Sequence, residues 1–151
     1  MILSAYPTIG KTSLANKRLD IIDLESSCFD KSNPNWYTDY CKTALDLEKQ
    51  GYTVFVSSHK PVQDYMKANA KRYVMIMYSP ELKDYVIRKC EARYNDTKLE
   101  KDLRAMERIK NCFSSDIQAL LDDNQLCRYV IYKENYNLED IVDKVIKNKG
   151  E

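Results

Sequence analysis

The chain has 151 residues, close to the usual size of one globular domain, and its 24 lysines and arginines against 23 aspartates and glutamates leave a net charge of +1. Hydrophobic residues make up 44% and charged residues 31%, which excludes a collagen-like, low-complexity or wholly disordered chain. The charge balance gives no overall attraction to nucleic acid or to a membrane. No apolar run has the length of a bilayer span and no signal peptide opens the chain, so we expect a cytoplasmic protein without a membrane partner.

The five cysteines are scattered along the chain, and no two of them have C-x-x-C spacing. Because the sequence contains a single histidine as well, it does not predict a zinc site. We expect the cysteines to be reduced thiols, as is usual in a cytosolic protein.

Short apolar runs alternate with helix-prone segments along the whole chain. Strands are predicted where β-branched and apolar residues cluster, over residues 2–4, 19–24, 52–57, 72–78 and 127–132. Helices are predicted from residue 13, from residue 138, and over residues 36–50, 61–70, 79–94 and 97–121. This alternation predicts one α/β domain over residues 1–151, a three-layer sandwich in which helices cover a five-stranded parallel sheet.

Two of these elements have clear burial patterns. Residues 72–78 (RYVMIMY) form a nearly continuous apolar run, which is typical of a strand covered on both faces. The last helix is amphipathic, and its inward face is predicted to carry Leu138, Ile141, Val142 and Val145.

The first predicted strand runs into a candidate phosphate-binding loop. The loop matches the pattern G-x-x-x-x-G-K-[ST] except at its first position, where alanine replaces glycine. In such a loop the backbone N–H groups surround phosphate oxygens, the lysine contacts the β- and γ-phosphates, and the hydroxyl of the threonine binds Mg²⁺. The predicted ATP-binding residues are Ala5, Tyr6, Pro7, Thr8, Ile9, Gly10, Lys11, Thr12 and Ser13.

Two observations limit this interpretation. A Gly-Lys-Thr sequence is also found as a simple helix cap in α/β proteins. Alanine disfavours a positive φ, so phosphate affinity should suffer if the backbone at Ala5 needs that conformation. In favour of the loop, the motif follows a predicted strand and opens a predicted helix.

Four segments in order resemble the small P-loop kinases: SAYPTIGKTSLA, IIDLESSCF, VFVSSHKPV, and RYVMIMYSP followed by Arg88 and Arg93. This group comprises nucleoside, nucleotide and polynucleotide kinases and short phage-encoded kinases, among them 5-hydroxymethyluridine DNA kinases. The resemblance implies a P-loop NTPase topology, the cofactors ATP and Mg²⁺, and as acceptor a nucleoside, a nucleotide or a modified base in DNA. If the chain is phage-encoded, the compartment is the host cytoplasm.

Two acidic residues, Asp23 and Glu25, follow the second predicted strand. They are two positions apart and share a face if the strand continues. Ligands of open α/β sheets bind outside this edge, where a carboxylate can bind Mg²⁺ or accept a proton from a hydroxyl group. The resemblance implies that Asp23 activates the phosphate acceptor and that Glu25 supports it; both could instead be ordinary solvated residues.

Further candidates for contact with the acceptor follow the next elements. Ser57 and His59 come after the third strand, where many P-loop proteins carry a Walker B aspartate that is absent here. This absence favours a kinase-like site over a motor or switch ATPase. Trp36 and Tyr37 begin the helix that follows the two acids and could stack on a base, although tyrosines at helical spacing are more often packed in a core. Residues 133–137 could border the adenine.

A charged helical region at about residues 81–123 is expected to act as a lid. In the kinases that the chain resembles, arginines of such a lid stabilise the transferred phosphoryl group, which points to Arg88 and Arg93. Arg104 and Arg108 form an i,i+4 pair and could serve instead. Any of the four could also lie on a solvated helix face.

The sequence therefore favours a phosphotransferase that uses ATP and Mg²⁺. A second hypothesis is a nucleotide-binding protein that transfers no phosphate, acting as a sensor, scavenger or interaction module. A third is a small α/β protein that binds no nucleotide.

Overall fold

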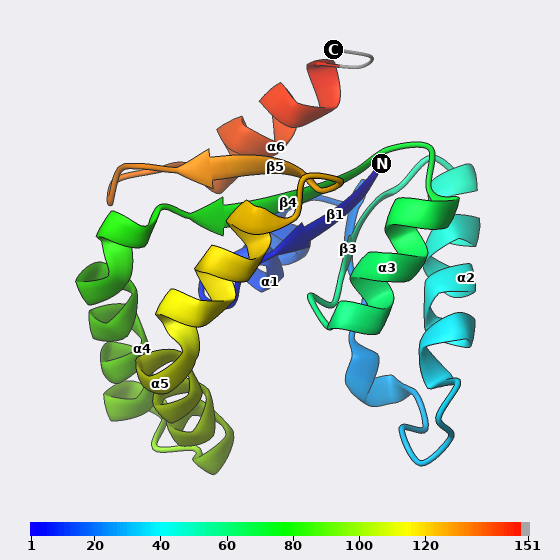
Figure 1. Ribbon diagram of the computed structural model, residues 1–151. Coiled ribbons are helices and arrows are strands. Elements are labelled where there is room, and N and C mark those ends of the chain that lie inside the picture. The colour runs from blue at the N-terminus through cyan, green and yellow to red at the C-terminus, as the bar shows by residue number, and fades with distance from the viewer. Residues whose placement is uncertain (149–151) are drawn as a thin grey trace. The chain divides into compact units, whose positions relative to one another are not determined.

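The structure is a computed structural model and describes residues 1–148. Five parallel strands form one sheet in the order β2-β3-β1-β4-β5, with helices alongside (Figure 1). The predicted five-stranded parallel α/β sheet is thereby confirmed. The strands are β1 (Ile2–Ala5), β2 (Ile21–Asp23), β3 (Thr53–Val56), β4 (Tyr73–Tyr78) and β5 (Cys127–Ile131).

Within residues 1–148, six α-helices follow the strands, with α4 and α5 consecutive between β4 and β5, and two short 3₁₀ helices lie among them. The α-helices are α1 (Lys11–Lys17), α2 (Trp36–Lys49), α3 (Lys60–Asn69), α4 (Lys83–Thr97), α5 (Glu100–Asp122) and α6 (Leu138–Lys147). The 3₁₀ helices are η1 (Ser26–Cys28) and η2 (Pro80–Leu82). Among residues 1–148, no helix combines the length and the apolar character needed to cross a membrane.

Differences from the predicted bounds have local causes. β2 begins at Ile21 rather than Leu19, because Arg18 folds back onto the carboxylate of Asp20 and leaves the Leu19 side chain 97% exposed. The helix expected from Ser79 starts as the 3₁₀ turn η2, where the Ser79 hydroxyl accepts a hydrogen bond from the N–H of Glu81. The sequence did not predict η1 at all.

The centre of the sheet is buried on both faces. β1 pairs with β3 through Ile2↔Val54 and with β4 through Ser4↔Met75. Every residue of β1, β3 and β4 is buried, as the continuous apolar run of β4 predicted. The four apolar residues predicted to face inward from α6 are also buried.

Two compact units make up the chain. The first unit contains residues 1–76, residues 125–129 and the segment from Asn137; the second contains residues 77–124 and 130–136. In the first unit α1 packs against α6, and α2 packs against α3. Right-handed crossovers place α1 on the face of the sheet opposite to α2 and α3. In the second unit α4 packs along α5.

Candidate functional site

The loop between β1 and α1 carries the predicted phosphate-binding motif. Ala5 is the last residue of β1, so its backbone is extended and its side chain is buried. The left-handed residues are Thr8, with φ 77°, and Gly10, with φ 108°. Replacement of glycine by alanine at position 5 therefore causes no backbone strain. Gly10, in contrast, has a φ that residues with side chains rarely adopt.

The conformation of Thr8 was not predicted from the sequence. A β-branched residue at φ 77° is uncommon, and such conformations are found more often at binding and catalytic sites than elsewhere. Together, Thr8 and Gly10 turn the backbone twice within three residues. Alternation of left- and right-handed residues in this way makes neighbouring N–H groups converge, which favours anion binding.

Helix α1 begins at Lys11, two residues earlier than expected. Its first hydrogen bond runs from the N–H of Leu14 to the carbonyl of Gly10, at 3.1 Å. The N–H groups of the first turn have no acceptor inside the helix, so they are directed out of its amino end. Within residues 1–148 the half-buried Lys11 side chain has no ion-pair partner.

The first turn of α1 contacts the end of β2. The hydroxyl of Thr12 donates a hydrogen bond to Oδ2 of Asp23, at 2.7 Å. Asp23 is the last residue of β2 and is half-buried, whereas Thr12 is exposed. The structure thus brings together the two residues that the sequence proposed as Mg²⁺ ligands, and their hydroxyl and carboxylate oxygens are the donor type that Mg²⁺ prefers.

Glu25 lies beyond the strand that carries Asp23. Because β2 ends at Asp23, the two acids do not share a strand face, and the exposed Glu25 instead precedes η1. Both carboxylates nevertheless affect the pKa of the Tyr40 hydroxyl. Burial raises the pKa of Tyr40 above its usual value, and the negative charges of Asp23 and Glu25 raise that pKa further.

The end of β3 carries the predicted acceptor residues. The Ser57 hydroxyl is hydrogen-bonded to Nδ1 of His59 and also accepts a hydrogen bond from the His59 backbone N–H, at 3.1 Å. The ring of Trp36 lies edge-on to His59, with centroids 5.7 Å apart, and edge-on to Tyr37, at 6.5 Å. The four residues that the sequence proposed for acceptor binding therefore form one cluster.

Lys31 belongs to the same cluster but was not predicted. Its ammonium lies 5.1 Å from the centroid of the Trp36 ring, which is a cation–π distance. The sequence signal was only a lysine in the turn that precedes α2.

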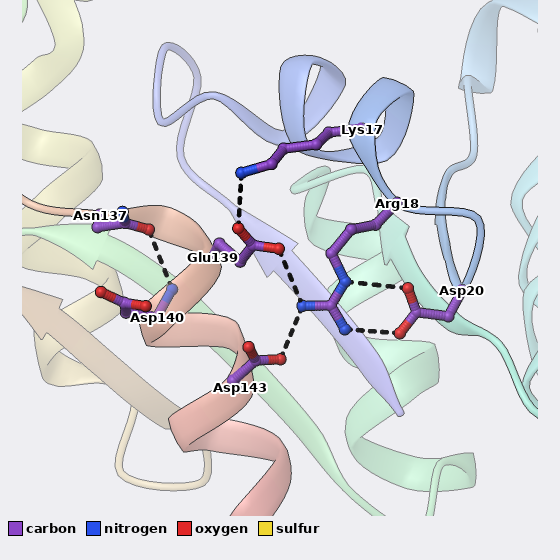
Figure 2. Close-up of polar contacts among 7 residues, drawn as sticks. All are labelled: Lys17, Arg18, Asp20, Asn137, Glu139, Asp140 and Asp143. Atoms are coloured by element: carbon purple, nitrogen blue, oxygen red, sulfur yellow. Dashed lines mark hydrogen bonds and ion pairs between the residues drawn. The ribbon is translucent and has the colours of Figure 1, made fainter.

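A polar network holds α1 against α6 (Figure 2). Arg18 follows α1 and bonds to Asp20 at 2.7 Å, to Asp143 at 2.8 Å and to Glu139 at 3.4 Å. Lys17 adds a second ion pair with Glu139 at 2.8 Å. The last residues of the phosphate-loop motif form the first turn of α1. By holding α1 against α6, this network fixes the position of that turn.

The second unit contains the predicted lid arginines. Each of the four forms an ion pair with a carboxylate of that unit. The pairs are Arg88–Glu134, Arg93–Asp102, Arg104–Glu100 and Arg108–Asp116, with N–O distances of 2.8, 3.3, 3.7 and 3.3 Å. The Asp102 side chain is only 7% exposed, so the pair with Arg93 is the most protected of the four.

Lys89, which follows Arg88, lies among tyrosines. Its ammonium donates a hydrogen bond to the hydroxyl of Tyr136, at 2.9 Å, and lies over the rings of Tyr78, Tyr85 and Tyr136 at 5.1–5.9 Å. Lys89 therefore joins α4 to β4 and to the segment after β5.

Comparison with known protein-family models and with curated proteins finds no match for the chain. Residues 1–148 also contain no group of three or more histidine, cysteine, aspartate or glutamate side chains able to enclose a metal ion. Among these residues, the candidate site consists of the phosphate loop and the side chains around it.

Proposed function

We propose that this protein is an ATP- and Mg²⁺-dependent phosphotransferase with a P-loop, nucleotide-kinase-like three-layer topology. It would transfer the γ-phosphoryl group of ATP to a nucleoside, a nucleotide or a modified base in DNA. The observation that carries the proposal is the hydrogen bond between Thr12 and Asp23, because it joins the phosphate motif to a carboxylate from another strand.

The sheet order supports this location of the site. In the sheet, β2 lies on one side of β1 and β4 lies on the other. The connection from β1 to β2 and the connection from β3 to β4 therefore run in opposite directions across the sheet. Ligands of open α/β sheets bind beyond the carboxyl ends of the strands at such a reversal of direction. The phosphate loop, Asp23 with Glu25, and Ser57 with His59 lie at the ends of β1, β2 and β3, and these groups are therefore at this edge.

On the ATP side, the chain provides positive charge and N–H donors. The amides of the first turn of α1 bind phosphate oxygens, and Lys11 places its ammonium on the β- and γ-phosphates. Thr12 and Asp23 would hold Mg²⁺, and these two ligands are enough because Mg²⁺ completes its shell with phosphates and water. When bound, Mg²⁺ neutralises the charge of the β- and γ-phosphates.

On the acceptor side, Asp23 receives the proton of the attacking hydroxyl group, with Glu25 in support. The hydrogen bond from Thr12 engages Oδ2 of Asp23, and its second oxygen, Oδ1, is the proton acceptor. Trp36, Tyr37 and His59 offer aromatic rings for a base. Positioning and charge neutralisation supply most of the rate, as in other phosphoryl transfers. Arg88 and Arg93 are the proposed lid cations.

A second candidate function, nucleotide binding without transfer, is favoured by one observation. Every proposed lid arginine forms an ion pair with a carboxylate in the second unit. A protein whose arginines stay in these pairs would bind nucleotide without stabilising a transferred phosphoryl group.

The test starts with thermal unfolding in the presence and absence of ATP and Mg²⁺. ATP should raise the Tm of the wild type but not that of Lys11→Ala. Lys42→Ala is the matched control, because it removes an exposed lysine from α2 and should keep the ATP effect. No effect of ATP on the wild type would refute both candidate functions.

Transfer of the γ-phosphoryl group is then followed with labelled ATP. The acceptors are thymidine, thymidine monophosphate and a single-stranded oligonucleotide containing 5-hydroxymethyluracil. A phosphotransferase labels at least one of them, and Asp23→Asn removes the labelling. If ATP stabilises the protein and no acceptor is labelled, the binding-only function is the better conclusion.

A further inference from the structure

The ladder between β2 and β3 has a regular pattern that stops at one point. The N–H of Thr53 bonds to the carbonyl of Asp20, at 2.9 Å, and the N–H of Leu24 bonds to the carbonyl of Phe55, at 3.0 Å. Hydrogen bonds of a parallel ladder are evenly spaced. The next bond in this series would run from the N–H of Ser57 to the carbonyl of Leu24.

The hydroxyl of Tyr40 stands in the place of that bond. It accepts a hydrogen bond from the N–H of Ser57 and donates one to the carbonyl of Leu24, each at 2.7 Å. A direct N–H···O bond would separate the two backbone atoms by about 2.9 Å. Two bonds in series through the hydroxyl oxygen hold the strand ends further apart.

The side chain that makes these bonds is firmly packed. Tyr40 is fully buried in α2, and its ring lies edge-on to Phe29, at 5.2 Å, and to Trp36, at 5.8 Å. On the other side of Ser57, its carbonyl accepts a hydrogen bond from the buried hydroxyl of Ser4, at 3.2 Å. Both backbone groups of Ser57 are therefore fixed by side chains.

We infer that Tyr40 is a positioning residue of the candidate site, an inference that rests on the proposed function. The Tyr40 hydroxyl lies between the ends of β2 and β3. It therefore sets the distance between the two acids at the end of β2, Asp23 and Glu25, and the Ser57–His59 pair that follows β3. Those groups make up the acceptor side of the site. Lys11 and the backbone amides of the loop after β1 do not depend on this bond.

Tyr40→Phe tests the inference because it removes only the hydroxyl and keeps the ring. The matched control is Tyr78→Phe, which also removes a buried hydroxyl, one that is hydrogen-bonded to Tyr136 at 3.0 Å and to Lys89 at 3.4 Å within the second unit. The Tyr40 hydroxyl also makes two hydrogen bonds, so we expect a similar loss of about 6 °C in Tm for both variants.

The decisive measurement is by NMR. The chain has one histidine, so the C2–H signal of His59 is unambiguous. In Tyr40→Phe, the backbone amide signal of Ser57 and the His59 C2–H signal should both move, because Ser57 bonds to Leu24 directly or loses its partner. In Tyr78→Phe both should stay near their wild-type positions. If Tyr40→Phe moves neither, Tyr40 is only a packing residue and the inference is wrong.

Kinetics give the second readout. With the acceptor that the labelling assay identifies, Tyr40→Phe should raise the KM for the acceptor about tenfold and leave the KM for ATP unchanged. Equal changes in both KM values, or the same change in Tyr78→Phe, would contradict the positioning role. If the wild type does not bind ATP, the proposed function fails, and the NMR comparison still decides whether Tyr40 fixes the two strand ends.

Discussion

The lysine of the phosphate loop and the four arginines of the second unit have different surroundings. In the first unit, Lys11 lies in the first turn of α1 and has no ion-pair partner within residues 1–148. In the second unit, Arg88, Arg93, Arg104 and Arg108 each pair with a carboxylate. An ammonium without an anion is available to a ligand, whereas a paired guanidinium must first leave its partner. Lys11 is therefore available to a phosphate group, whereas the four arginines stabilise the second unit.

The largest expected effect concerns the contribution of Lys11 to ATP binding. Lys11→Ala should weaken ATP binding about a hundredfold, because a charged hydrogen bond to phosphate is lost, and should leave the free energy of unfolding without ATP unchanged. Isothermal titration with ATP and Mg²⁺ measures the first quantity and urea unfolding the second. Comparable ATP affinity in Lys11→Ala would show that this lysine does not contact the nucleotide.

The next effect concerns the stability of the second unit. Asp102 accepts a hydrogen bond from the Thr97 hydroxyl, at 2.5 Å, and pairs with Arg93 while almost fully buried. Asp102→Ala should therefore lower the free energy of unfolding by about 2 kcal/mol. Glu100→Ala, which removes the exposed partner of Arg104, should lower it by no more than about 0.5 kcal/mol. Similar losses in urea unfolding would contradict the difference in burial.

A smaller effect tests whether a paired arginine can be released for function. Glu134→Gln removes the charge that holds Arg88. If Arg88 is a lid residue, this variant should transfer phosphate a few times faster, and Arg88→Ala should be about tenfold slower than the wild type. Initial rates at saturating ATP measure both. Unchanged rates in both variants would assign Arg88 to the solvated surface.

The smallest expected effect is on the free energy of unfolding at acidic pH. The hydrogen bond from Arg18 lowers the pKa of Asp20 below its usual value. A carboxyl group whose pKa is lower in the folded state adds stability above its unfolded pKa, and that stability is lost as pH falls through the folded pKa. Asp20→Asn should therefore cost about 0.5 kcal/mol at pH 7, and the difference from the wild type should shrink below about pH 4. Urea unfolding at the two pH values is the measurement; a difference that grows in acid would contradict the assignment.

Much of the fold could be predicted because burial leaves a pattern in the sequence. The apolar run of β4 and the inward residues of α6, such as Val142 and Val145, are periodic signals, and the structure buries them. The start of β2 was wrong by two residues because an ion pair, Arg18 with Asp20, decides it. An ion pair of this kind depends on side-chain geometry rather than on periodicity.

In the candidate site, too, some features could be predicted from the sequence and others depend on side-chain geometry. The meeting of Thr12 and Asp23 followed from the rule that parallel strands end at one edge of a sheet. In contrast, the sequence does not distinguish Tyr40 from other tyrosines at helical spacing. Only the register of β2 against β3 shows where its hydroxyl lies. For the same reason the sequence drew attention to Ala5, while the unusual backbone is that of Thr8.

The network around Arg18 has a consequence for the order of folding. α1 has seven residues, which is too short to be a stable helix without tertiary contacts. Its partners Glu139 and Asp143 lie more than 120 residues later in the chain. During synthesis, the phosphate loop is therefore made early but its helix is secured late, once α6 has left the ribosome. A nascent chain should acquire affinity for ATP only at that final stage.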